Sequence, residues 1–192
     1  MSAKRDNNVI AQYKQTWSNL FQVGKQNHVH AGEFHIRSIP AHVPLIALIL
    51  KSDWLHRYQL CIDIIAIDQP GKRYRFSVVY HLLSLTYNTR YILTTQTTAL
   101  QGLESLFMLY NSVIWSEREV WDLYGILIKN HPDLRRILTD YGFKDFPLRK
   151  DFPLSGHLEL VYSATDHGIR QRPVELAQEY RLFHFTEKEI QR

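Results

Sequence analysis

The chain has few of the residues that hold cofactors. It has one cysteine, Cys61, and eight glycines that stand singly along its 192 residues. One thiol cannot form an internal disulfide, supply the roughly four thiolates of an iron–sulfur cluster, or complete a structural zinc site of the Cys/His type. Isolated glycines provide neither a Gly-x-Gly dinucleotide turn nor a phosphate loop. The sequence therefore predicts no cofactor and no metal bound by this chain.

Catalytic motifs are also absent. There is no Gly-x-Ser-x-Gly elbow for a serine nucleophile and no His-Glu-x-x-His pair for zinc. Cys61 lies in the apolar run Leu60-Cys61-Ile62, which favours a buried packing thiol in a reducing compartment. We expect no catalytic residue in this chain.

Long apolar segments are missing too. The longest uncharged apolar run, residues 43–50, is far shorter than the roughly 20 residues that span a bilayer, and it contains Pro44 near its start. The first residues offer neither the apolar core of a secretory signal nor an acid-free transit helix. We expect no transmembrane segment and no removable leader.

What the chain does have is an ordinary globular composition with an excess of positive charge. Hydrophobic residues make up 45% and aromatic residues 12%, and the formal net charge is +4. A chain of this length buries one core. The charge suits an anionic partner, which could be RNA, a phospholipid surface or an acidic protein patch.

Hydrophobic periodicity predicts an α+β fold. Apolar residues three or four apart indicate helices over residues 8–23 and 44–56, and a long or broken helix over residues 103–128 that ends near Gly125. Alternating or β-branched stretches indicate strands over residues 28–39, 58–67, 73–85 and 90–98. We therefore expect an antiparallel or mixed sheet of about four strands with helices packed on one face.

The chain changes character after Gly142. Prolines punctuate charged and aromatic residues, and no period of 2 or 3.6 persists until a possible short helix over residues 173–183. The stretch has too many large apolar residues for a disordered linker. The sequence predicts an α+β domain over residues 1–142 and, over residues 143–192, an extended C-terminal arm that wraps a partner subunit.

The charged residues of the segment 117–122 have structural explanations that involve no catalysis. On a helix, Glu117 and Glu119 point about 200° apart and cannot form an acid/base pair, whereas Arg118 and Asp122 are spaced for an ion pair along the helix.

The basic strand at residues 72–80 carries alternating aromatic residues and offers an alternative function as an RNA-binding surface.

Residues 131–154 pack charges of both signs between apolar anchors, as interfaces do. Here the chain resembles the thirty-kilodalton subunit of respiratory complex I. The resemblance rests on Glu-Arg-Glu (117–119), Asp-Leu-Tyr-Gly-Ile (122–126) and His-Pro-Asp-Leu-Arg-Arg-Ile-Leu (131–138), and it continues in the same order through residues 139–143, 147–156 and 173–181. At residues 113–116 and 144–147 this chain departs from the usual family sequence.

The resemblance implies a non-catalytic structural subunit in the peripheral arm of proton-pumping NADH:ubiquinone oxidoreductase. Its implied partners are the quinone-site subunit of the forty-nine-kilodalton type and neighbouring iron–sulfur subunits, with FMN and the iron–sulfur clusters bound by those partners. The implied location is the matrix side of the mitochondrial inner membrane, or the cytoplasmic side of a bacterial membrane. The expected partner-contact residues are Glu117, Arg118, Glu119, Asp122, His131, Arg135, Arg136, Asp140, Tyr141, Arg149, Lys150 and Asp151.

Overall fold

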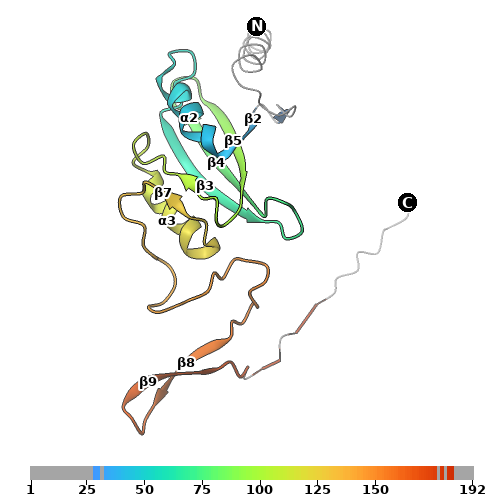
Figure 1. Cartoon of the computed structure of the whole chain (residues 1–192), viewed down its shortest axis with the longest axis vertical. Coiled ribbons are helices and arrows are strands. Elements are labelled where there is room, and N and C mark those ends of the chain that lie inside the picture. Colours follow the sequence, from blue (N-terminus) through green and yellow to red (C-terminus); the bar gives the residue numbers. More distant parts are fainter. Residues whose placement is uncertain (1–27, 31–32, 177, 180, 184–192) are drawn as a thin grey trace, which may run out of the picture. The chain divides into compact units, whose positions relative to one another are not determined.

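The computed structural model describes residues 28–30, 33–176, 178–179 and 181–183, which fall into two compact units, residues 1–151 and residues 152–192 (Figure 1). No helix in these ranges is long and apolar enough to cross a bilayer. The elements in chain order are β1 (His28–His30), β2 (Glu33–Ser38), η1 (Pro40–His42), α2 (Val43–Ser52), β3 (Leu60–Asp68), β4 (Phe76–Ser84), β5 (Thr89–Thr97), β6 (Leu103–Glu104), α3 (Val113–Tyr124), β7 (Ile128–Lys129), β8 (Leu158–Ser163) and β9 (Gly168–Pro173).

The main sheet of the first unit is mixed. Its strand order is β1-β2-β5-β4-β3, with β2 parallel to β5 and every other pair antiparallel. Strands β3, β4 and β5 are consecutive in the chain and form a meander. The α+β prediction with a mixed sheet is therefore confirmed.

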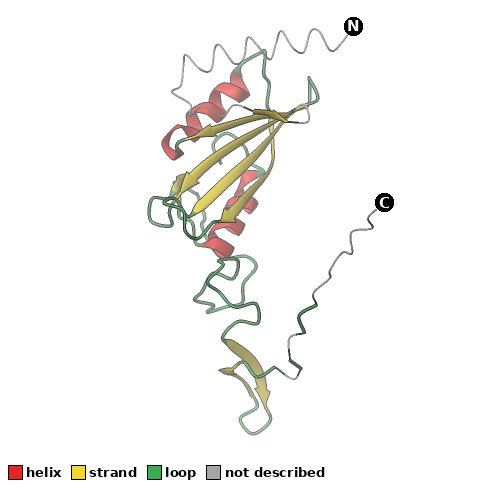
Figure 2. Ribbon diagram, turned by 90° about the vertical axis from the view of Figure 1, so that its right-hand side faces the viewer, coloured by secondary structure: helices red, strands yellow, loops and turns green. Residues whose placement is uncertain are grey.

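Alternation along the strands produces one buried face. On β4, every second residue from Phe76 to Leu82 is at most 2% exposed, as expected for a strand with one face on the core. Helices α2 and α3 both lie against this face (Figure 2). The prediction that helices pack on one face of the sheet is confirmed.

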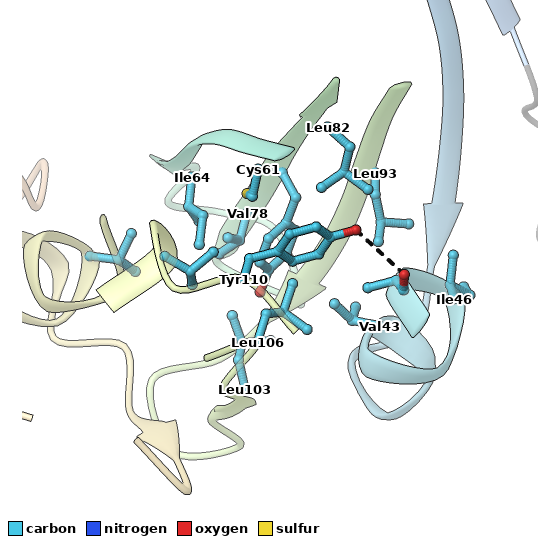
Figure 3. Close-up of a cluster of buried hydrophobic side chains, with 14 of the residues drawn as sticks. Val43, Ile46, Cys61, Ile64, Val78, Leu82, Leu93, Leu103, Leu106 and Tyr110 are labelled. Atoms are coloured by element: carbon cyan, nitrogen blue, oxygen red, sulfur yellow. Dashed lines mark hydrogen bonds between the residues drawn. The ribbon is translucent and has the colours of Figure 1, made fainter. Parts of the chain in front are cut away.

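Tyr110 occupies the centre of the core between the sheet and α2 (Figure 3). Its hydroxyl donates a hydrogen bond to the carbonyl of Tyr58 at 2.8 Å and lies 3.5 Å from the carbonyl of Ala47. Burial of a tyrosine is favourable when its hydroxyl finds such a partner. This residue therefore ties the middle of α2 and the segment before β3 to the segment that leads into α3.

The prediction of a long or broken helix over residues 103–128 is wrong in its first half. Residues 103–104 form β6, which pairs in parallel with β7, and the helix begins only at Val113. Gly102 adopts a positive φ of 68°, and the Leu103 amide then donates to the Leu127 carbonyl. The apolar side chains of Leu103 and Leu106 reach the core from this short strand and the turn after it. Their spacing of three residues is the same as that of neighbours on one face of a helix.

The helix ends where the sequence predicts. Gly125 is the residue after α3, has a φ of 70°, and its amide donates to the Trp121 carbonyl. Glycine is the usual residue at this left-handed position. The other predicted helix, 44–56, is confirmed as α2, although it ends earlier, at Ser52.

The predicted strand regions all contain strands, the first as the hairpin β1–β2. The predicted helix over residues 8–23 lies outside the described residues. The described residues of the stretch 173–183 contain no helix, so that prediction is wrong there. Pro173 instead closes β9, and the described residues after it have no regular structure.

The second unit contains a β-hairpin that the sequence analysis missed. Strands β8 and β9 pair antiparallel, with Tyr162 opposite Ile169 and Glu159 opposite Arg172. The signal was present as alternating Leu158, Leu160 and Tyr162. Prolines on both sides of this short run obscured it.

Candidate functional site

The predicted contact residues lie on α3 and on the loop that follows it, residues 130–151. Most of them bind one another or other parts of the first unit. The structure therefore assigns many of these side chains an internal role. Their contact with a partner stays a prediction.

Glu117 is the most deeply placed charged residue in the first half of α3. It is 2% exposed, and it accepts hydrogen bonds from the Ser105 hydroxyl (2.6 Å) and the Leu106 amide (2.8 Å). The imidazole Nε2 of His131 lies 3.7 Å from its carboxylate, too far for a hydrogen bond. Burial raises the pKa of Glu117 to about 7 despite the two donors, and burial also lowers the pKa of His131.

Glu117 thus holds the loop before α3 and also lies against His131 in the loop after it. Glu119, two residues along the helix, is exposed. The opposed directions predicted for Glu117 and Glu119 are confirmed. Neither carboxyl has the other one beside it, as paired acid/base catalysis needs.

The predicted ion pair between Arg118 and Asp122 is wrong. Arg118 instead donates to the carbonyl and carboxylate of Asp133, at 2.8 and 2.9 Å, and Arg135 binds the same carboxylate. The two-point contact with Asp133 is stronger than an exposed pair along a helix. Arg118 therefore holds the loop after β7 against α3.

Asp122 is fully buried and binds residues 137–139 of the loop. Its Oδ2 accepts the backbone amides of Ile137, Leu138 and Thr139, and its Oδ1 accepts the Thr139 hydroxyl at 2.6 Å. Burial alone would raise the pKa of Asp122, but these donors outweigh it and lower the pKa. Arg136 adds an ion pair at 3.4 Å.

Arg149 returns from the end of the loop to the C-terminus of α3. It donates to the Tyr124 carbonyl at 2.7 Å and lies over the rings of Phe146 and Phe76. Cations at a helix C-terminus satisfy carbonyls that have no partner within the helix. The Leu148 amide also donates to the Leu123 carbonyl, so residues 146–149 pack along the end of α3.

A second ionic group fixes the end of this segment to the sheet. Arg75 binds Asp68 through two nitrogens at 2.7 Å and Asp151 at 2.6 Å, and the Lys150 amide donates to Asp68. The hydrogen bonds from Arg75, despite the opposing effect of burial, lower the pKa of Asp68. Sequence analysis missed Arg75 and Asp68, because they flank the turn after β3 and lie far along the chain from the loop they bind.

A smaller set of the predicted residues faces outward. Tyr141 is 100% exposed, and the carboxylate of its exposed neighbour Asp140 accepts the Tyr141 amide. The exposed members of the set are Glu119, Arg135, Asp140, Tyr141, Lys150 and Asp151.

Among the described residues, no cluster of three or more histidine, cysteine or acidic side chains is arranged to hold a metal. Cys61 is buried, as the sequence predicts, and burial raises its pKa to about 12. A thiol with this pKa is neither a nucleophile nor a ready metal ligand at neutral pH.

The aromatic stacking face that the RNA-binding alternative predicts on the basic strand is wrong. That alternative required the aromatic residues of the basic strand to stack on bases, but Phe76 and Tyr80 are 1% and 2% exposed. Both point into the core from β4, where they pack below α2 and α3. Of the aromatic residues in this stretch, only Tyr74, before the strand, is exposed.

Comparison with known proteins gives a consistent result. The family model described as respiratory-chain NADH dehydrogenase, 30 Kd subunit, matches residues 36–158. NADH-ubiquinone oxidoreductase subunit 9 of Prototheca wickerhamii is 45% identical, over 83% of this chain and 84% of its own length. NADH dehydrogenase (ubiquinone) iron-sulfur protein 3 of Oryza sativa subsp. japonica is 42% identical over 94% and 95%.

Two further comparisons involve a bacterial relative and an archaeal structure. An NADH-quinone oxidoreductase subunit of Parvibaculum lavamentivorans is 43% identical over 82% of this chain and 79% of its own length. One solved chain of the archaeal membrane-bound sulfane sulfur reductase, described as a respiratory membrane complex, superposes with a TM-score of 0.63 at 21% identity, covering 77% of this chain and 86% of that one. This last likeness concerns the fold alone. The family match and the relatives show that the chain belongs to the family of the respiratory-chain NADH dehydrogenase 30 Kd subunit.

Proposed function

We propose that the chain is a non-catalytic structural subunit of the hydrophilic arm of a proton-pumping NADH:ubiquinone oxidoreductase. In this role it supports the docking of the quinone-site subunit. FMN and the iron–sulfur clusters belong to other subunits, since one buried thiol cannot ligate a cluster. The subunit lies on the matrix side of the mitochondrial inner membrane, or on the cytoplasmic side of a bacterial membrane.

The observation that carries the proposal is the two-sided hairpin β8–β9. Leu158, Leu160 and Tyr162 share one face with Ile169, and these side chains are 59%, 52%, 62% and 72% exposed. An isolated two-stranded hairpin is marginal in water. An apolar face of this kind marks a surface for another protein.

The other face of the hairpin is polar. Arg172 forms an ion pair with Glu159 across the strands, and Arg170 binds Asp166 in the turn. Charges on one face and apolar side chains on the other give the hairpin a single orientation towards a partner. The proposal therefore puts the apolar face against a neighbouring subunit and the charged face towards solvent.

The test begins with the tagged chain in a host that assembles the complex. Solubilised membranes are resolved by blue-native electrophoresis, stained in the gel for NADH dehydrogenase activity, and analysed by mass spectrometry. Co-migration with an active complex that contains the quinone-site subunit supports the proposal. Migration of the chain alone refutes it.

Matched variants then test the hairpin face. We expect Leu160→Asp and Tyr162→Asp to reduce incorporation into the complex at least tenfold, because each places a charge in the apolar contact. Val161→Asp is the control: it makes the same type of change on the opposite face, beside its cross-strand neighbour Arg170. Equal incorporation of all three variants would remove the hairpin from the interface.

A further inference from the structure

The sheet face opposite α2 and α3 contains a shallow depression of about 250 Å³ near the turn between β3 and β4. Strand β2 lines one side, β5 the floor, and β4 with the turn the other side. Strand register places Arg37 beside Thr94 and Ser77 beside Gln96. The lining residues are His35, Ile36, Arg37, Gln69, Lys72, Ser77, Thr94 and Gln96.

These side chains converge because of the pleat. Thr94 and Gln96 are two residues apart on β5 and therefore point to the same face. Neighbouring strands lie about 4.8 Å apart and each residue rises about 3.3 Å, so Arg37 on β2 and Ser77 on β4 flank that pair with their backbones roughly 12 Å apart. Lys72 reaches the group from the turn.

The depression has positive charge and no negative charge. Arg37 and Lys72 are exposed cations, His35 is a third basic side chain, and no aspartate or glutamate lines the wall. No hydrogen bond or ion pair joins the head groups of Arg37 and Lys72 to any other residue in the described part of the chain. Elsewhere in the same unit, arginines such as Arg75 and Arg118 have carboxylate partners.

The neutral groups around these cations are also unpaired. Gln69, Gln96, Thr94 and Ser77 offer amide and hydroxyl donors with no side-chain partner in the described residues, and the Nε2 of His35 is shielded from solvent without a hydrogen bond. Buried polar atoms normally have a partner. A tetrahedral anion accepts hydrogen bonds from several directions at once and suits a ring of donors around two cations.

We propose that this depression binds an anion of the phosphate class, with Arg37 and Lys72 as the charged donors and the amides and hydroxyls around them as neutral donors. The volume exceeds that of a phosphate group, and the depression is open to solvent, so a phosphomonoester can enter with its organic part outside. A soluble phosphomonoester and a phospholipid head group present this same chemistry. The proposal is independent of the docking role proposed above.

The first experiment titrates the purified full chain with inorganic phosphate at low ionic strength and follows heat or ³¹P line width. We expect saturable binding of one phosphate, and a loss of about tenfold or more in affinity for Arg37→Gln and for Lys72→Gln, because each variant removes a charged hydrogen bond. The control is Arg90→Gln, which removes the same charge from the other end of β5, roughly 20 Å from Gln96. Circular dichroism checks that all variants fold.

Absence of saturable binding would overturn the proposal. Equal weakening by Arg90→Gln and Arg37→Gln would overturn it as well, because the effect would then come from net charge. A second arm measures flotation with neutral vesicles that contain or lack phosphatidate. Loss of flotation in Arg37→Gln, together with weak binding of glycerol phosphate, identifies a lipid head group as the source; the reverse pattern identifies a soluble phosphomonoester.

Discussion

Two carboxyl groups on α3 show how burial and hydrogen bonding decide the state of a residue. Glu117 and Asp122 are both buried, at 2% and 0% exposed. Glu117 accepts two hydrogen bonds and has a raised pKa, whereas Asp122 accepts three backbone amides and a hydroxyl and has a lowered pKa. The number of donors therefore determines which of these carboxyl groups is ionised without cost at neutral pH.

The raised pKa of Glu117 predicts a stability that falls as the pH rises. The unfolded chain loses this proton near pH 4.5 and the folded chain near pH 7, so the stabilising effect of the proton is complete below pH 4.5 and lost above pH 7. The full difference is on the order of 3 kcal/mol. We expect Glu117→Gln to remove this dependence, measured as the free energy of unfolding in urea at pH 5 and pH 8.

Because His131 also titrates, the pH dependence of the unfolding free energy must be compared between the native chain and the Glu117→Gln variant. Its pKa is lowered, so its contribution to stability is lost as the pH falls, opposite to that of Glu117. The difference between the native chain and Glu117→Gln isolates the carboxyl group. An identical change from pH 5 to pH 8 in both proteins would show that Glu117 does not titrate in this range.

Asp122→Asn tests the buried carboxylate that holds the loop. The amide side chain keeps the shape but loses the charge that three backbone amides and Arg136 bind. We expect a loss of about 2–4 kcal/mol in unfolding free energy at pH 7. Asp140→Asn, which changes an exposed aspartate of the same loop, should cost less than about 0.5 kcal/mol; a similar loss in both would contradict the assigned role of Asp122.

At the scale of elements, the end of α3 is a tightly packed place in the first unit. A β-carbon at Gly125 would lie 2.5 Å from the Arg149 guanidinium and 2.6 Å from the Phe146 ring. Gly142 has a similar φ, 76° against 70°, but no atom lies within 4 Å of the place that a β-carbon would take there. Substitutions at these two glycines therefore distinguish the cost of backbone strain, which both share, from the cost of steric crowding, which arises only at Gly125.

We expect Gly125→Ala to lower the melting temperature well beyond the effect of Gly142→Ala. Both variants strain a left-handed backbone by about 1 kcal/mol, and only the first also displaces Arg149 and Phe146 from the helix end, at an added cost of about 1–3 kcal/mol. Differential scanning calorimetry of the two variants measures the difference. Equal melting temperatures would mean that the 146–149 segment moves aside without cost.

The elements with a regular period could be predicted from sequence, and those set by distant contacts could not. The strands of the sheet and the stop of α3 at Gly125 follow from alternation and from the conformational freedom of glycine. The start of α3 could not be predicted, because Leu103 and Leu106 reach the core from a short strand and a turn. The hydrogen-bond partners of Arg118 and Arg149 were unpredictable for the same reason, since each lies at least 15 residues away along the chain.

At the scale of the whole chain, residues 143–151 belong with the first unit through Arg149, Lys150 and Asp151. Residues 152–192 form a unit of their own. The division after residue 142, with an arm that wraps a partner, stays a prediction. The hydrogen bonds and ion pairs of residues 146–151 nevertheless predict where the chain can be truncated without lowering the stability of the first unit.

A chain that stops after Asp151 should keep the unfolding free energy of the first unit, and a chain that stops after Phe143 should lose several kcal/mol. The shorter chain lacks the groups that bind Tyr124, Asp68 and Arg75, and each lost charged hydrogen bond costs about 1.5–3 kcal/mol. Guanidinium denaturation of both chains measures the difference. Equal stability would show that residues 144–151 are held by the unit without supporting it.

The anchoring of Asp151 to Arg75 also orders events during synthesis on the ribosome. The first unit cannot complete its bonds until residue 151 has emerged, and the hairpin, with its exposed leucines and tyrosine, emerges afterwards. Chains are made at about 5–20 residues per second, so the remainder up to Pro173 takes on the order of a few seconds. The apolar face of the hairpin β8–β9 thus emerges from the ribosome after the first unit has all the residues it needs to fold. This order shortens the time in which the exposed face could associate with an unfolded neighbouring chain.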